Sequence, residues 1–378
     1  MVMGYRLWVI EARFFHNQCP IGQKMYFCGM KKRQLFRMVS VMRTFFVFFG
    51  FFIATTGTSL AQECGCTDSM AKNYNVEATV NDGSCKYAQT TLKAEVLGTL
   101  DSLVEGSSTL FYWQNGLWTY NDHVSNCIYL IDSTSASITD ALCVKRIKNQ
   151  DTEEIAQDSL YLYFGDFGNN SGRRKNLLIL RVSKESLENK VFRIDTIRFS
   201  YEDQTDFTAR LNATDFDCEA FIVTDDSIYL FTKQWASAQT TVYSLPKTPG
   251  THVAHRRDTY NTKGLVTGAT YVLEYQLIVL CGYDFDRKNL FSALHPFLIL
   301  LYDYKDDHFF SGNKRRLDFP SGTKAQIEGI ATSNGLDFYL TSEHFHTTRM
   351  GLTFDFPAQL WRVDLRKYLM PYLKKINQ

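Results

Sequence analysis

Residues 219–245 have the sequence EAFIVTDDSIYLFTKQWASAQTTVYSL, in which three strand-sized runs follow one another. The first two runs, residues 219–223 and 227–233, are separated by a short polar turn, and the third covers residues 241–245. Each run is rich in aromatic and β-branched residues, which pack well on a pleated surface. The stretch therefore predicts consecutive antiparallel strands.

The same pattern recurs along the chain. Five units, each with an apolar run, a second run and a third run, begin at Glu105, Glu154, Glu219, Gly268 and Glu328. The starts are about 50–65 residues apart, and repeats of this length with four strands each are typical of a β-propeller. A four-stranded sheet cannot bury both faces alone, whereas sheets stacked around an axis bury each other.

The ends of the repeat region predict how the ring closes. The fifth unit has no obvious fourth strand, and residues 92–100 (LKAEVLGTL) form a lone strand-like run ahead of the first unit. We expect an all-β fold, a propeller of five blades closed by this N-terminal strand. Six blades are the alternative, with one hidden in residues 188–215 or 303–327. A β-sandwich or two stacked all-β domains would have the same composition.

Composition excludes several classes of protein. The 378 residues include 41 Lys and Arg against 40 Asp and Glu, so a broad electrostatic grip on nucleic acid or on an anionic membrane is not expected. The chain is 45% hydrophobic and 15% aromatic, which excludes a disordered protein.

Residues 1–61 are interpreted as an upstream extension and a signal peptide. Phe45–Ala54 is an uncharged apolar run that follows basic residues and is too short for a membrane span, which needs roughly 20 residues. Small residues then predict cleavage between Ala61 and Gln62. We expect a secreted or periplasmic mature chain without a membrane span, with a small cysteine module at 62–90 and the propeller domain at 91–378.

The cysteines of such a chain are expected to meet oxidising conditions. Cys66 and Cys85 can close a loop too short for a core of its own. Cys127 and Cys143 flank a turn centred near residue 135, so antiparallel pairing predicts a cross-strand disulfide. The other two cysteines of the propeller region, Cys218 and Cys281, are predicted to be buried free thiols.

Acidic residues recur at equivalent points of the units. In a propeller the start of each inner strand and the end of each second strand emerge on one face. The starts have Glu105, Glu154, Glu219 and Glu328, and the ends have Asp122, Asp166, Lys233, Asp284 and Glu343. Like charges around one channel mouth favour protonation or a bound cation. Ca²⁺ accepts six to eight oxygens, so these carboxylates are candidate calcium ligands, with Asn121, Asn169 and Asn170 as possible additions.

Other interpretations of these residues stay open. The repeated Glu residues could instead cap the blades through hydrogen bonds to neighbouring backbone. Asp122, His123 and Asp166 are the candidate catalytic residues, although a surface histidine would also explain His123. The polar, Gly-rich loop at 165–174 could approach a ligand closely. The candidate ligand-binding residues are Asn169, Asn170, Arg173, Arg174 and Lys233; the two arginines suit phosphate or carboxylate, or form a solvated pair.

Two stretches resemble known families. The motif CTD…NYN…NDGSC at 66–85 resembles short modules in secreted proteins of marine and Bacteroidetes-type bacteria. LWTYND at 117–122, GDFGNN at 165–170 and DCEAF at 217–221 together resemble secreted Bacteroidetes-type β-propellers. More distantly, the chain is similar to Ca²⁺-dependent phytase-like and gluconolactonase-type propellers. That likeness implies a cation held by acids and Asn, although Tyr120 replaces the histidine usual in the nearer relatives.

Two functions fit the sequence. The first is a secreted propeller that binds a small molecule, a glycan or an envelope protein and has a cation site at its acidic channel mouth. The second is a Ca²⁺-dependent hydrolase of phosphoesters or lactones, in which the cation polarises the substrate and a carboxylate or His123 moves the proton. Motifs for other common hydrolases and phosphate loops are absent from the sequence.

Overall fold

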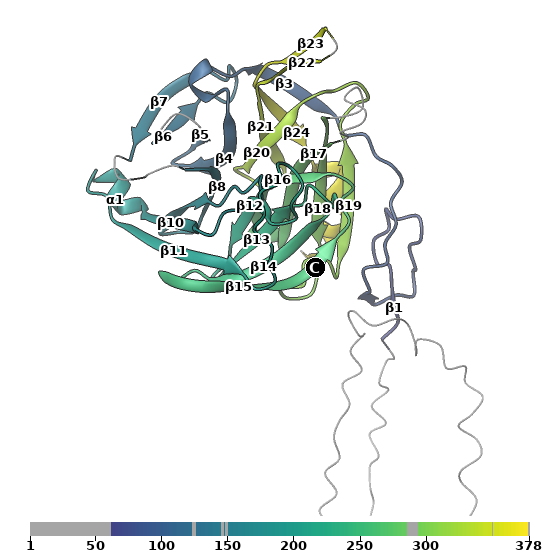
Figure 1. Ribbon diagram of the computed structural model, residues 1–378. Helices are drawn as coiled ribbons and strands as arrows, with labels where there is room; N and C mark the ends of the chain where they lie inside the picture. Colours follow the sequence, from purple (N-terminus) through teal and green to yellow (C-terminus); the bar gives the residue numbers. More distant parts are fainter. Residues whose placement is uncertain are drawn as a thin grey trace, which may run out of the picture.

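The chain folds as an all-β propeller, confirming the expected fold class (Figure 1). The computed structural model describes residues 62–122, 126–144, 147, 150–285, 294–349 and 351–376. Residues 1–61, for which the sequence predicts an upstream extension and a signal peptide, lie outside the described residues. Secretion and the division of the chain at residues 61 and 90 stay predictions.

Twenty of the 24 described strands form five antiparallel groups of four around a common axis, and the other four form two separate pairs. The inner strands are β4 (Ser107–Trp113), β8 (Thr152–Gln157), β12 (Asp217–Val223), β16 (Leu265–Val272) and β20 (Gln326–Thr332). The second strands are β5 (Gly116–Asn121), β9 (Tyr161–Asp166), β13 (Ser227–Lys233), β17 (Leu277–Asp284) and β21 (Asp337–Glu343).

The two outer positions complete each group. The third strands are β6 (Cys127–Ile131), β10 (Leu177–Ser183), β14 (Thr240–Pro246), β18 (His295–Tyr302) and β24 (Gln359–Asp364). The fourth strands are β7 (Ile138–Cys143), β11 (Ile194–Tyr201), β15 (Gly250–Tyr260), β19 (Asn313–Asp318) and β3 (Ala94–Thr99). The long strand β15 also pairs in parallel with β11, which joins two groups into one eight-stranded sheet.

The ring closes through the N-terminal strand, as the sequence predicts. Strand β3 pairs antiparallel with β24, so the first and last parts of the propeller share one sheet. These two strands are far apart in sequence. Because β3 leads directly into the first group, its pairing with β24 holds the last group against the first.

Strand β12 shows how the groups stack. All seven of its residues are buried. Cys218, Phe221 and Val223 join a cluster with the preceding group, whereas Ala220 and Ile222 join a cluster with the following group. Because side chains alternate along a strand, each sheet buries both faces against its neighbours, which explains the nearly continuous apolar runs.

The disulfides follow the expected pairing. Cys127 and Cys143 lie opposite each other on β6 and β7 and are bonded, and Cys66 is bonded to Cys85. Cys218 and Cys281 are buried free thiols, as predicted.

The cysteine module contains a two-stranded pair, β1 (Cys64–Gly65) and β2 (Val80–Asn81), and lies against the outer strands of one group. The Asp68 carboxylate accepts hydrogen bonds of 2.6 Å from Tyr302 and 2.7 Å from Tyr87. The Asn81 amide donates to Asp303 at 3.0 Å. The contacts with Tyr302 and Asp303 hold the module on the propeller.

The remaining elements are short. They are η1 (Ser102–Val104), η2 (Leu273–Tyr275), α1 (Lys184–Glu188), the hairpin β22 (Phe345–Arg349) and β23 (Leu352–Phe356), and α2 (Arg366–Ile376). Helix α2 is not expected from the sequence, and one side of it is buried through Tyr368, Leu369, Tyr372 and Leu373. Within the described residues, no helix is long and apolar enough to cross a bilayer.

Candidate functional site

Every inner strand has a β-bulge at the same level of the channel. In each case one inner-strand residue is left unpaired while the second strand continues without interruption. Bulges re-aim side chains and are common next to functional sites. The five bulge residues are Ser108, Glu153, Glu219, Thr267 and Glu328.

This register corrects the alignment made from the sequence. The equivalent of Glu219 and Glu328 in the second group is Glu153, one residue before the expected Glu154. In the first group it is Ser108, three residues after the expected Glu105. Glu105 lies outside β4, is exposed, and has its carboxylate 3.5 Å from His344 Nδ1. A single bulge moves every following side chain to the other face, so spacing alone could not locate these positions.

The second strands show the same offset. The residues equivalent to Lys233 are Asp122, Phe167, Tyr283 and Glu343. Two of the predicted acids therefore fall one residue away. Asp166 pairs with Arg174 at 2.7 Å, and Asp284 pairs with Arg316 at 2.7 Å. We call the five bulge residues and these five second-strand residues the channel ring.

The channel ring contains five carboxylates and one ammonium group. Lys233 is bonded to Glu219 and lies 3.9 Å from Glu328, and all three side chains are buried. Burial alone would lower the pKa of Lys233, but Glu219 and Glu328 raise it well above its usual value. Lys233 thus neutralises part of the ring from within the chain, where the sequence suggested a ligand contact.

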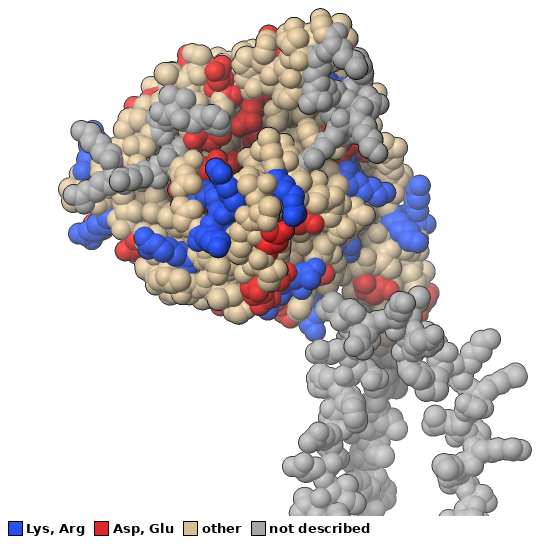
Figure 2. All heavy atoms as spheres, in the orientation of Figure 1, with Lys and Arg blue, Asp and Glu red and all other residues tan. Residues whose placement is uncertain are grey.

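Two other carboxylates of the ring, those of Glu153 and Glu343, have raised pKa values. Burial, with Glu219 and Asp151 nearby, raises the pKa of Glu153 well above its usual value. Burial and the Asp122 carboxylate raise the pKa of Glu343 to about 8. In both cases like charges are held close together and away from water. Protonation or a bound cation would relieve this repulsion, so the channel ring favours both. The space-filling view has acidic side chains gathered in a hollow near the middle of the visible face (Figure 2).

Glu154 lies one step deeper in the channel and bridges two inner strands. Its Oε1 accepts from the Ile155 backbone N–H at 2.9 Å and is bonded to the Thr109 hydroxyl. Its Oε2 accepts from the backbone N–H of Ala269 on β16 at 3.2 Å. Since these contacts occupy both oxygens, Glu154 is placed to hold strands together.

The remaining candidates fall into two sets. Arg174 is buried and donates to Gly168 O and to Asp166, and Asn169 accepts from the Arg174 backbone N–H, so both stabilise the loop itself. Arg173 is exposed, and Asn170 Oδ1 is buried with no hydrogen-bond partner among the described residues. His123 lies outside the described residues.

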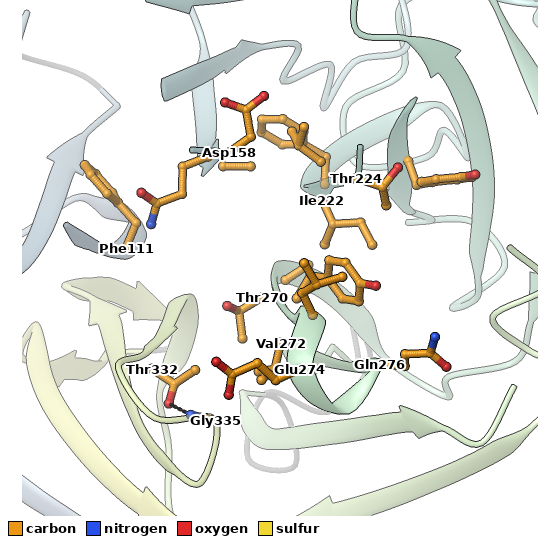
Figure 3. A pocket seen from close by; sticks show the side chains of 18 of the residues that line it. Phe111, Asp158, Ile222, Thr224, Thr270, Val272, Glu274, Gln276, Thr332 and Gly335 are labelled. Atoms are coloured by element: carbon orange, nitrogen blue, oxygen red, sulfur yellow. Dashed lines mark hydrogen bonds between the residues drawn. The ribbon is translucent and has the colours of Figure 1, made fainter. Parts of the chain in front are cut away.

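The opposite end of the channel opens into a cavity of about 1170 Å³, here called the chamber. All five inner strands contribute to its wall, which begins with the residues that follow Glu154 and its equivalents in the other inner strands. The first wall residues are Leu110, Ile155, Phe221, Ala269 and Ile330. Figure 3 shows Phe111, Ile222, Thr270 and Thr332 around a common opening, with Glu274 at its edge.

Sequence reasoning missed the chamber because its wall is made of ordinary strand residues. The turns at its rim were nevertheless visible as polar clusters, among them Thr224-Asp225-Asp226 and Ser333-Asn334-Gly335. In a propeller such turns join inner to second strands, so they gather at the face opposite the acidic one.

No protein-family model matches the chain, and no curated protein matches its sequence. Among solved structures, it is similar to glutaminyl cyclase from Myxococcus xanthus, with 12% identity, a TM-score of 0.40, and coverage of 73% of this chain and 100% of that one. The PQQ-bound aldose sugar dehydrogenase from Streptomyces coelicolor has 11% identity, a TM-score of 0.40, and coverage of 72% and 98%. A gluconolactonase from Xanthomonas campestris has 12% identity, a TM-score of 0.34, and coverage of 73% and 97%. These are distant likenesses of fold, and no activity follows from them.

Proposed function

We propose that the protein is a secreted or periplasmic propeller that works as a binding module and holds a cation in its channel ring. The observation behind the proposal is the imbalance of the ring, in which five carboxylates surround the single ammonium group of Lys233. Lys233 accounts for Glu219 and Glu328, and it leaves Glu153 and Glu343 with raised pKa values that a bound cation would relieve.

The chemistry of the ring favours calcium among the common cations. Its charged donors are carboxylate oxygens, which suit a hard ion with flexible coordination. Ser108 and Thr267 add hydroxyl groups at the same level, although both are bonded to the backbone of the neighbouring strand. The carboxylates of Glu153 and Asp151 lie so close to Gly168 that a side chain at this position would collide with them.

Calcium is therefore expected to raise the melting temperature of the wild-type protein by several degrees, and a chelator to reverse the rise. The reason is that a ligand bound by the folded state alone stabilises it by mass action. Glu153→Gln keeps the shape of the side chain but removes one charge, so it should reduce the calcium-dependent rise. Differential scanning calorimetry with and without calcium measures both effects.

Glu105→Gln is the matched control, because Glu105 is an acid of the same repeat series that lies outside the ring. It should leave the calcium-dependent rise unchanged. A wild-type protein whose melting temperature ignores calcium would contradict the cation proposal. Calcium-dependent turnover of a phosphoester or lactone, lost in Glu153→Gln, would instead assign the hydrolase function.

The separation of the two ends of the channel supports binding over hydrolysis. The Glu154 carboxylate lies between the ring and the chamber, so an ion in the ring does not line the chamber wall. We propose that the chamber holds the ligand, a polyhydroxylated molecule such as a glycan. Its wall combines aromatic faces, including Phe111 and Tyr271, with the hydroxyl of Thr270 and the carboxylate of Glu274.

The chamber assignment predicts a specific loss of affinity. Glu274→Ala should raise the Kd of a glycan found by array screening by about tenfold, the cost of about one hydrogen bond to a charged group. Its melting temperature should stay at the wild-type value, because the Glu274 side chain is exposed. Glu185→Ala on α1, away from the chamber lining, is the control in isothermal titration calorimetry. Equal affinity in all three proteins would remove the chamber from the proposal.

A further inference from the structure

The β22–β23 hairpin extends from the last group of strands and has two different sides. Phe345 and Phe356 are paired across the hairpin, stack with 6.1 Å between ring centroids, and pack toward the buried cluster of Leu265 and Tyr283. His344 and His346 flank Phe345, so period-two alternation directs both to the other side. Asp355 is the cross-strand partner of His346.

These three side chains converge at the surface. His344 Nε2 lies 2.6 Å from Asp355 Oδ1, and His346 Nδ1 lies 3.6 Å from the same oxygen. One ligand atom from each residue fits within 4.8 Å of the other two. Within the described part of the chain, no other group of three His, Cys, Asp or Glu side chains meets this spacing, so an ion in the channel ring would have to draw its carboxylates closer together.

A fourth residue orients one of the imidazoles. Glu105 Oε2 lies 3.5 Å from His344 Nδ1, on the opposite side of the ring from Asp355. The His344 backbone N–H also donates to Glu105 O at 2.8 Å, which holds the two residues together. A histidine ligand commonly binds a metal through one nitrogen and donates its other N–H to a carboxylate, which fixes its tautomer.

We propose that His344, His346 and Asp355 bind a divalent transition-metal ion, with zinc as the expected occupant and Glu105 as a positioning residue. Zinc accepts two imidazole nitrogens and one carboxylate oxygen, whereas calcium prefers oxygen donors throughout, so the two imidazoles favour zinc. Three protein ligands leave at least one coordination position for water or an external ligand. This site is separate from the channel ring, whose acidic donors are all oxygens, and it does not depend on the proposed function.

A salt bridge between protonated His344 and Asp355 is the simpler explanation of that pair. That explanation would place two like charges side by side if His346 were protonated as well, because its ring centroid lies 6.3 Å from that of His344 and its Nδ1 lies 3.6 Å from the same carboxylate oxygen. The metal site uses both imidazoles in their neutral form, and it explains why Glu105 lies on the far side of His344.

The test is a titration of the tag-free, chelator-treated protein with zinc by isothermal titration calorimetry, and with cobalt by visible absorption. We expect one ion per chain and a cobalt spectrum typical of nitrogen and oxygen ligands. His346→Gln and Asp355→Asn should each weaken binding by at least about tenfold, and Glu105→Gln by about tenfold through the orientation of His344.

His255→Gln is the matched control. His255 is an exposed histidine that lies 2.9 Å from the Glu202 carboxylate, and this ion pair contains no second histidine. It should leave zinc affinity unchanged. The proposal is overturned if zinc produces no binding heat, or if the zinc affinity survives both His346→Gln and Asp355→Asn. Circular dichroism of each variant confirms that the fold is retained.

Discussion

Replacing Lys233 with methionine should destabilise the protein by about 3–5 kcal/mol, the usual cost of removing one partner from a buried ion pair. The Lys233 side chain is only 4% exposed and has Glu219 and Glu328 as its carboxylate partners. Methionine has a similar length but no charge, so the two carboxylates would stay buried without their cation. Urea unfolding followed by tryptophan fluorescence measures the difference.

The surroundings of the Lys233 ammonium group explain why water would not solvate Glu219 and Glu328 if that charge were removed. Its ammonium group lies 4.8 Å from the ring centroid of Trp235 and 5.4 Å from that of Tyr283. These aromatic faces attract a cation and exclude solvent. Position 233 of the channel ring is therefore suited to a long cationic side chain.

Two further variants separate the loss of charge from the loss of packing. Adding Glu219→Gln to Lys233→Met removes one of the two carboxylates that are left without a cation, and it should restore part of the stability. Lys247→Met is the comparison, because Lys247 bonds Asp158 at 3.1 Å with its side chain 22% exposed, and it should cost clearly less than Lys233→Met. Equal losses for Lys233→Met and Lys247→Met would contradict the account of the ring.

The sequence predicts the large features of this fold because they depend on repeating patterns. Apolar runs of strand length located the five groups, and the unmatched run at 92–100 identified the strand that closes the ring. The turn between Cys127 and Cys143 was sufficient to pair them, since antiparallel register follows from the turn.

The candidate site was predicted less accurately because its geometry depends on single residues. The bulge selects Glu153 over Glu154, a choice that two adjacent glutamates conceal in the sequence. Asp166 and Asp284 look like members of the same series as Glu343, yet each lies one residue from the ring and binds an arginine. Alternation along a strand turns such a one-residue offset into opposite faces.

The histidine site was missed for a different reason. Its ligands belong to a hairpin inserted between the second and third strands of the last group, so the repeat pattern says nothing about them. The sequence His344-Phe-His346 was the available signal, because alternating residues of a strand share a side. The cross-strand position of Asp355 became evident only from the register of the hairpin.

Gly329→Ala should destabilise the protein by about 3 kcal/mol, near the upper end of the range for overpacking. Gly329 follows the bulge of β20, and a Cβ atom there would lie 2.6 Å from Leu110 N and 2.7 Å from Thr109 C. Both are main-chain atoms of β4, so the collision occurs where the last group meets the first. A side chain could rotate away, but the backbone of a paired inner strand cannot move without opening the ring.

The sign of this effect is informative, because Gly→Ala substitutions at unstrained positions stabilise proteins by about 0.4–1 kcal/mol through the unfolded state. The added Cβ would also meet the Thr341 hydroxyl, and Thr341→Ala removes that contact while leaving the backbone of β4 in place. We therefore expect the double variant to remain as unstable in urea as Gly329→Ala alone. Recovery of wild-type stability in the double variant would contradict this explanation. It would show that β20 and β4 can move apart, and that the backbone of β4 does not require glycine at position 329.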